Sequence, residues 1–282
     1  MDIDLHYPKN DRLKKTIEYY YFLKTDSSDF RSEYYSFPNT LQALNIHSNI
    51  SYRIYSQYTH VSGISEKNNV ILLQGKYQIP LRVCLEGILD KITVIFKPIG
   101  LNYYSISPIS KIAGEHTQVY SDWQSDSNYE SFLVSFFSET NNDARIEILE
   151  NFLLQRFTEF QGASLLERAI ELLSDFSIEI SIEEMASELQ LHVRTFNRLF
   201  YKYVGISPVQ FRKVARFRHS LKNKVVNDHF KKLTNLAYES NFYDQSYFVK
   251  IYKSLTKETP ASFFNSTHPL ADNQLIFRFL EK

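Results

Sequence analysis

Two stretches of the chain decide its fold: residues 186–211 read ASELQLHVRTFNRLFYKYVGISPVQF, and residues 237–263 read AYESNFYDQSYFVKIYKSLTKETPASF. They are two copies of one pattern. Five positions of the first copy recur 52 residues later, as Phe196 and Phe248, Phe200 and Tyr252, Ser207 and Thr259, Pro208 and Pro260, and Phe211 and Phe263. Neither copy is long enough to be a solenoid unit with further partners, so we expect two copies of a small helical unit.

The first copy predicts a helix, a tight turn and a second helix. Ser181 followed by Glu184 is the start of a capping box for a helix over about 182–189. After a short break, a second helix runs over about 193–204 and ends at Gly205, a residue suited to a left-handed C-cap. The arrangement predicted is therefore helix–turn–helix.

The second helix of each copy has an apolar face, which packs into a core, and a polar, basic face left to solvent. In the second copy, Asp244 is the natural N-cap. A helix–turn–helix unit lays its second helix in the major groove, with residues near its N-terminus at the base edges. The side chains expected to read bases are Arg194, Asn197, Arg198, Ser246, Tyr247 and Lys250.

Residues 207–224 join the two units. Their sequence predicts a helix that forms a rod roughly 25 Å long. Such a rod would hold the two second helices about one duplex turn, ~34 Å, apart. Basic side chains on the rod and on the second helices are expected to contact phosphates. They are Lys202, Arg212, Lys213, Arg216, Arg218 and Lys253.

Charge is sorted along the chain, although the net charge of the 282 residues is zero. Residues 1–174 hold 16 basic and 21 acidic side chains, whereas residues 192–257 hold 14 basic and 3 acidic ones. This asymmetry indicates a polyanionic partner for the basic half. A nonspecific nucleic-acid binder is the rival interpretation, but Arg and Asn on the outer faces favour base reading, since Arg pairs with guanine and Asn with adenine.

The two units together resemble the DNA-binding domain of AraC/XylS-type bacterial transcription regulators. The resemblance lies in RTFNRLFYKYVGISPVQF at 194–211 and NFYDQSYFVKIYKSLTKETPASFF at 241–264. It implies sequence-specific binding to double-stranded promoter DNA, control of transcription and contact with RNA polymerase. It also assigns base reading to the same six side chains.

The chain departs from the family pattern in the turns of both units. Gln190, Asn241 and Lys257 stand where the family usually has Gly, and His192 stands where Ser or Thr often caps the second helix. Lys in a left-handed conformation costs about 1 kcal/mol or more. We therefore expect these departures to lower local stability rather than to change function.

The N-terminal half has a different pattern. From about 33 to 120, short runs rich in β-branched and aromatic residues alternate with turn formers, as in a sandwich or barrel. Residues 11–23 fit a short helix, or a strand at their Tyr run, and 143–157 have helical spacing. The fold class predicted is α+β with two domains, a β-rich one followed by an all-α tandem helix–turn–helix one. The predicted divisions are 1–160, a helical connection at 161–176, the DNA-binding domain at 177–268 and a tail at 269–282.

The N-terminal domain loosely resembles β-rich domains that precede such paired units, which implies a sensing or dimerising role. An unknown small-molecule effector and a homodimer are the expected partners. The stripe formed by Ile146, Leu149, Leu153 and Phe157 either packs on its own domain, which we favour, or forms a seam between two chains.

Catalytic and metal-binding patterns are scarce. The eight histidines show no ligand spacing, so His47, His60 and His116 would meet only through tertiary structure, and we expect no metal and no cofactor. Cys84 is expected to be a buried structural thiol. A cupin-like enzyme domain fused to a nucleic-acid-binding module is the alternative function. The single cysteine and the polar N-terminus predict a cytoplasmic protein without membrane association.

Overall fold

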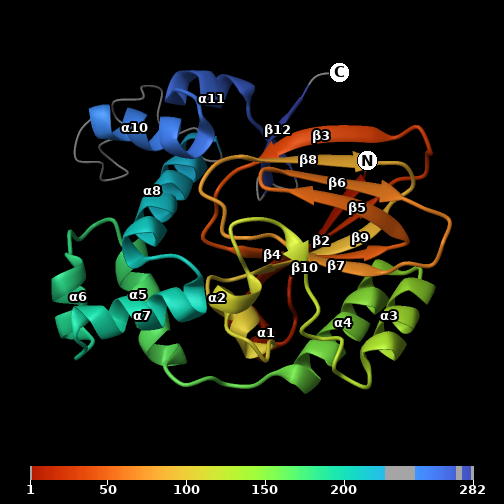
Figure 1. Cartoon of the computed structure of the whole chain (residues 1–282), viewed down its shortest axis with the longest axis horizontal. Coiled ribbons are helices and arrows are strands. Elements are labelled where there is room, and N and C mark those ends of the chain that lie inside the picture. Colours follow the sequence, from red (N-terminus) through yellow and green to blue (C-terminus); the bar gives the residue numbers. More distant parts are fainter. Residues whose placement is uncertain (1, 226–244, 271–274, 281–282) are drawn as a thin grey trace.

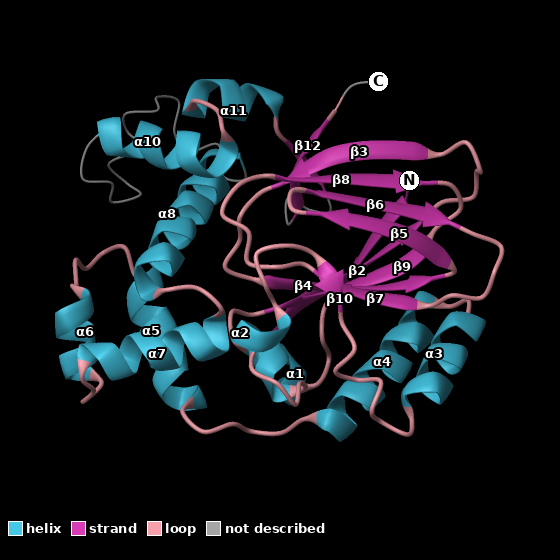
Figure 2. Cartoon of the chain, viewed as in Figure 1, coloured by secondary structure: helices cyan, strands magenta, loops and turns pink. Residues whose placement is uncertain are grey.

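The fold is described from a computed structural model, which covers residues 2–225, 245–270 and 275–280. Two six-stranded sheets stack face to face in the N-terminal half (Figures 1 and 2). The first sheet, in spatial order, holds β1 (Asp2–His6), β2 (Ile17–Lys24), β9 (Asp90–Phe96), β4 (Gln42–Ser48), β7 (Val70–Leu73) and β10 (Gln118–Val119). The second holds β11 (His268–Leu270), β12 (Leu275–Phe279), β3 (Arg31–Ser36), β8 (Leu81–Glu86), β6 (Tyr58–Gly63) and β5 (Ile50–Tyr55).

One set of helices lies beside the sandwich, and a second set forms the C-terminal half (Figure 2). The helices of the N-terminal half are α1 (Asp11–Thr16), a 3-10 turn η1 (Gly100–Tyr103), α2 (Ile109–Ile112), α3 (Tyr129–Ser138) and α4 (Asn142–Arg156). Within the described residues, those that follow are α5 (Ala163–Ser174), α6 (Ile182–Glu188), α7 (Val193–Val204), α8 (Pro208–Val225), α10 (Gln245–Thr256) and α11 (Pro260–Ser266). This two-part architecture confirms the predicted fold class.

Successive residues of a strand point to opposite faces of its sheet, and the inward-pointing apolar ones form the core between the two sheets. Strands β3 and β8 pair antiparallel, and Tyr34 lies opposite Val83, both buried. Strand β6 runs parallel to β8, which places Val61 opposite Leu85 on the same inner face. One face of the second sheet is thus apolar, and its other face is left for polar residues.

The structure decides between the two interpretations that the sequence leaves open for residues 11–23 and for the apolar stripe of α4. Residues 11–23 contain both elements, because α1 ends at Thr16 and the Tyr run continues as β2 between β1 and β9. The apolar stripe of α4 is buried inside the chain, with Ile146, Leu149 and Leu153 at most 1% exposed. Packing on its own domain, and not a seam between chains, therefore accounts for this stripe.

The end of the chain returns to the sandwich. Beyond α11, strand β12 pairs with β3, with Arg278 opposite Tyr35 and Phe279 opposite Tyr34. Residues 275–279, which lie in the stretch that the sequence pattern leaves as a tail, thus contribute a strand to the second sheet. This pairing ties the C-terminal helices to the N-terminal half.

Candidate DNA-binding surface

The first helix–turn–helix unit is built from α6 and α7. Ser181 and Glu184 form the predicted capping box, in which the Ser181 hydroxyl accepts from the Glu184 amide and the Glu184 carboxylate accepts from the Ser181 amide. Gln190 takes a φ of 56° in the turn, and Gly205 ends α7 with a φ of 85°. The side chain of His192 makes no capping bond, as expected from its weak capping chemistry.

Helix α7 has the two faces that the sequence predicts. Phe196, Phe200 and Val204 are buried against α6 and α8. Arg194 and Arg198 are exposed on the opposite face, where they can reach a duplex. Asn197 is half-buried beside them, and its side-chain amide donates to the Val193 carbonyl at 3.0 Å.

Helix α10 repeats this arrangement in the second unit. Phe248, Ile251 and Tyr252 are buried against α8 and α11. The predicted base-reading side chains of this helix and the predicted phosphate contact at its end are all exposed. They are Ser246, Tyr247, Lys250 and Lys253. The first helix of this unit and the predictions for Asn241 and Asp244 lie outside the described residues.

Basic side chains of α8 lie between the two units. Arg212, Lys213 and Arg216 line a cavity of about 210 Å³ together with Tyr247 of α10. Burial and the charge of Arg212 lower the pKa of Arg216, and its Nε has no partner among the described residues. Lys213 donates to the Ser254 hydroxyl at 2.7 Å. A phosphate oxygen at this cavity would offset the crowding of positive charge.

Arg218 corrects one of the sequence-based predictions. Instead of facing solvent for a phosphate, its guanidinium points into the N-terminal half, where Nε donates to the Pro38 carbonyl at 2.7 Å. A second nitrogen donates to the Phe37 carbonyl. The helical pattern of α8 places Arg218 on a face but does not reveal what covers that face.

Phe37, a residue of the N-terminal half, packs into the core of the second unit. It follows β3, is 1% exposed and packs edge-on to Phe263 of α11 with ring centroids 4.8 Å apart. Val214, Phe217 and Leu221 of α8 belong to the same cluster. Sequence reasoning missed this residue, because a single Phe after a predicted strand looks like any other core position.

Asn102 holds the first unit in a similar way. Its side-chain amide donates to the Tyr203 carbonyl at the end of α7 at 2.8 Å, and its oxygen accepts from the Ile109 amide at the start of α2. The Tyr203 ring stacks on Phe160, with centroids 4.5 Å apart. The N-terminal half therefore contacts both units.

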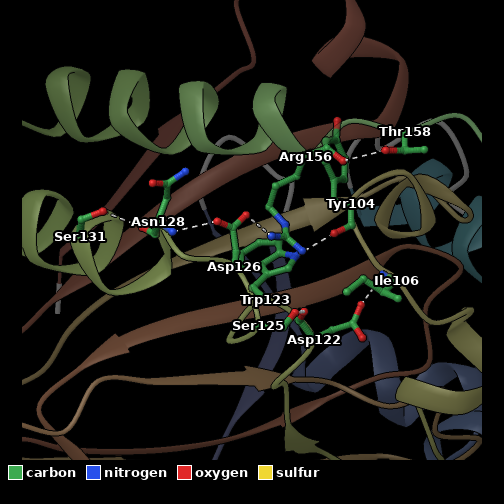
Figure 3. Close-up of polar contacts among 10 residues, drawn as sticks. All are labelled: Tyr104, Ile106, Asp122, Trp123, Ser125, Asp126, Asn128, Ser131, Arg156 and Thr158. Atoms are coloured by element: carbon green, nitrogen blue, oxygen red, sulfur yellow. Dashed lines mark hydrogen bonds and ion pairs between the residues drawn. The ribbon is translucent and has the colours of Figure 1, made fainter.

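A polar network fixes the segment that leads into α2 (Figure 3). The Asp122 carboxylate accepts from the backbone amides of Ile106 and Ser107, and the Trp123 indole donates to the Tyr104 carbonyl at 3.0 Å. Arg156 of α4 pairs with Asp126, whose pKa is lowered by an Asn128 amide and by this Arg. This network positions α2 against α7.

The histidines do not form a common enzyme site. His47 is buried in the first sheet, where burial lowers its pKa, and His116 is exposed before β10. His60 lies on the outer face of the second sheet beside Glu86, with Nε2 2.7 Å from the carboxylate. Among residues 2–225, 245–270 and 275–280, no helix has both the length and the apolar character to cross a membrane.

The helix–turn–helix unit of α6 and α7, together with the exposed polar and basic face of α10, is typical of a DNA-binding protein. Residues 185–266 match the family model described as a helix-turn-helix domain. By this match, residues 185–266 form a DNA-binding helix–turn–helix domain of the AraC type. No curated protein matches the chain.

Among solved structures, the chain is similar to ToxT from Vibrio cholerae. One ToxT structure shares 16% identity over 86% of this chain and 98% of that chain, with a TM-score of 0.43. ToxT bound to (E)-4-(8-methylnaphthalen-1-yl)but-3-enoic acid shares 15% identity over 94% and 99%, with a TM-score of 0.43. Unsaturated fatty acid bound wild-type ToxT shares 14% identity over 86% and 94%, with a TM-score of 0.39.

Proposed function

We propose that the chain regulates transcription by placing α7 and α10 in successive major grooves of one promoter duplex. The observation that carries this proposal is the repeated exposure of polar and basic side chains on the second helix of each unit. The side chains proposed to read bases are Arg194, Asn197, Arg198, Ser246, Tyr247 and Lys250. Arg198 and Lys250 are long donors that suit guanine or phosphate, whereas Asn197 suits adenine.

Phosphate contacts are proposed for the basic residues that remain available around the two helices. Lys202 and Lys253 are exposed on α7 and α10. Lys213 and Arg216 line the cavity between the units, so they would meet the backbone between the two grooves. Arg212 lines the same cavity, but its two terminal nitrogens donate to the Ile178 and Ile180 carbonyls, so it is left out of this set. Arg218 is left out of this set because its guanidinium is occupied by Phe37 and Pro38.

The N-terminal half is proposed to control how the two helices are presented. Asn102 contacts the end of α7, and Phe37 packs into the second unit. A shift of either contact would change the angle between the units, and DNA binding demands one angle. RNA polymerase and a second copy of the chain are further partners, both proposed from the resemblance to AraC/XylS regulators.

A small-molecule effector is proposed at the junction of the two halves. Lys76, Tyr77, Arg218 and Phe277 line a cavity there of about 60 Å³, which has room for only a few water molecules. Burial lowers the pKa of Lys76 to about 7. A larger molecule would have to displace Arg218 from Pro38, and its binding would thereby be coupled to the placement of α8.

The test is selection of bound duplexes from random DNA by the full chain, followed by footprinting. We expect one enriched sequence with two protected major-groove segments about one helical turn apart. Enrichment of no sequence, or protection of a single groove, would contradict the proposal. The alternative of an enzyme domain is not favoured, because His47, His60 and His116 lie on different sheets and loops.

A further inference from the structure

The outer face of the second sheet carries a cluster unrelated to DNA binding. Strands β6 and β8 run parallel, with His60 opposite Cys84 and Ser62 opposite Glu86. Residues two apart in a strand point to the same face, so these four side chains occupy one patch on two neighbouring strands. The linear sequence hides the patch because its two halves are more than twenty residues apart.

The donor atoms of three of these residues are close enough to share one ion. The imidazole nitrogen of His60, the sulfur of Cys84 and a carboxylate oxygen of Glu86 all lie within 4.8 Å of one another. In a tetrahedral zinc site, bonds of about 2.0–2.3 Å place neighbouring donors roughly 3.3–3.8 Å apart. Small side-chain rotations would therefore bring the three atoms around a single ion.

We propose that His60, Cys84 and Glu86 bind a divalent transition-metal ion of the zinc class. Imidazole, thiolate and carboxylate are the usual protein ligands of Zn²⁺. The thiolate disfavours Mg²⁺ and Ca²⁺, which prefer oxygen donors. Two negative ligands and one neutral ligand match the double charge of the ion, and water fills the fourth position.

Neighbouring side chains hold the cluster in place. The Tyr58 ring is nearly parallel to the His60 imidazole, at 9° and 6.3 Å between centroids. The Ser62 hydroxyl lies 3.2 Å from His60 Nε2. Arg31 is 3.9 Å from Glu86, but both side chains are about half exposed, so this ion pair is a weak competitor for the carboxylate.

The inference is independent of the proposed DNA binding. The cluster lies on β6 and β8, whereas the exposed faces of α7 and α10 belong to the helical half on the other side of the molecule (Figure 1). A bound ion would crosslink two parallel strands that are far apart in sequence. It would stabilise the second sheet by mass action.

The experiment titrates Co²⁺ into the full, reduced chain and records absorption. We expect one ion per chain, a near-ultraviolet thiolate-to-cobalt band and visible bands typical of tetrahedral cobalt, all removed by excess Zn²⁺. Cys84→Ser should abolish the thiolate band. Glu86→Gln and His60→Ala should each weaken binding at least about tenfold.

His116→Ala is the matched control, because this exposed histidine lies outside the cluster, and its affinity for Co²⁺ should stay unchanged. Far-ultraviolet circular dichroism checks that Cys84→Ser and Glu86→Gln keep the fold. Absence of the thiolate band in the unaltered chain, or equal affinity in all four variants, would overturn the metal site and leave an ion pair beside a buried thiol. Neither result bears on duplex selection.

Discussion

Arg218 on α8 donates through Nε to the backbone carbonyl of Pro38 at 2.7 Å, which joins the rod between the two DNA-binding units to the loop after β3. A backbone carbonyl is a fixed acceptor, so this bond depends on the position of the whole N-terminal half. Burial lowers the pKa of Arg218, and nearby Tyr77, Tyr19 and Tyr252 act in the opposite direction. Arg218 thus links α8 to the N-terminal half and does not serve as a link between the protein and DNA.

The hydrogen bond from Arg218 to Pro38 predicts that replacing Arg218 changes stability, whereas replacing Lys202 changes DNA binding. Arg218→Ala should lower the free energy of unfolding of the full chain by about 1–3 kcal/mol, because two buried carbonyls lose a charged donor. It should leave the salt dependence of DNA binding unchanged. Lys202→Ala should instead reduce the salt slope by about one phosphate and barely change stability.

Urea unfolding and DNA titrations between low and moderate salt measure the two quantities. A reduced salt slope for Arg218→Ala would mean that the side chain leaves Pro38 and contacts the duplex in the complex. Lys202→Ala serves as the matched control, since Lys202 is exposed on α7, where its ammonium lies 4.7 Å from the ring centroid of the neighbouring Tyr203.

Local signals made the helical half predictable. The Ser181 capping box, the left-handed Gly205 and the repeat spacing each depend on neighbouring residues, and α10 and α11 begin 52 residues after α7 and α8. The partner of Arg218 was not predictable, because helical periodicity gives a face and not its neighbour. The pairing of β6 with β8 and of β12 with β3 joins distant segments, and only the tertiary fold brings them together.

Lys257 offers a test of backbone strain in the second unit. It has a φ of 66°, a conformation that costs a side-chain-bearing residue about 1 kcal/mol relative to Gly. Lys257→Gly should therefore raise the thermal unfolding midpoint by roughly 2–4 °C. Lys250→Gly, inside α10, is the control and should lower the midpoint, because Gly is disfavoured within a helix.

Lys91 predicts a pH dependence of stability. Burial lowers its pKa from 10.5 to about 8, and its ammonium donates to the Asn45 side chain at 3.2 Å. Between these two pKa values the unfolded chain binds more protons at this residue, so its contribution makes the free energy of unfolding rise with pH. The charged form destabilises the fold below about pH 8, and this penalty is relieved towards pH 10.5.

Lys91→Met removes this titration. Asn45 keeps a donor, since the Thr93 hydroxyl also donates to its side-chain oxygen at 2.8 Å. We expect the variant to gain stability on the order of 2 kcal/mol at pH 7 and to show a flatter rise up to pH 10. Urea unfolding across this range measures both, with Lys67→Met, at an exposed position, as control. A slope equal to that of the unaltered chain would contradict the assignment to Lys91.

Arg198 provides the sharpest test of base reading. It is exposed on α7, one turn after Arg194. If it contacts a base, Arg198→Ala should cost about 1–3 kcal/mol on the selected duplex and relax the preference at one base pair. Binding to random DNA should fall far less. Arg53→Ala, exposed on β5, should change neither affinity. Equal losses on selected and random duplexes would show that Arg198 contacts only phosphates, and α7 would then need another side chain to read sequence.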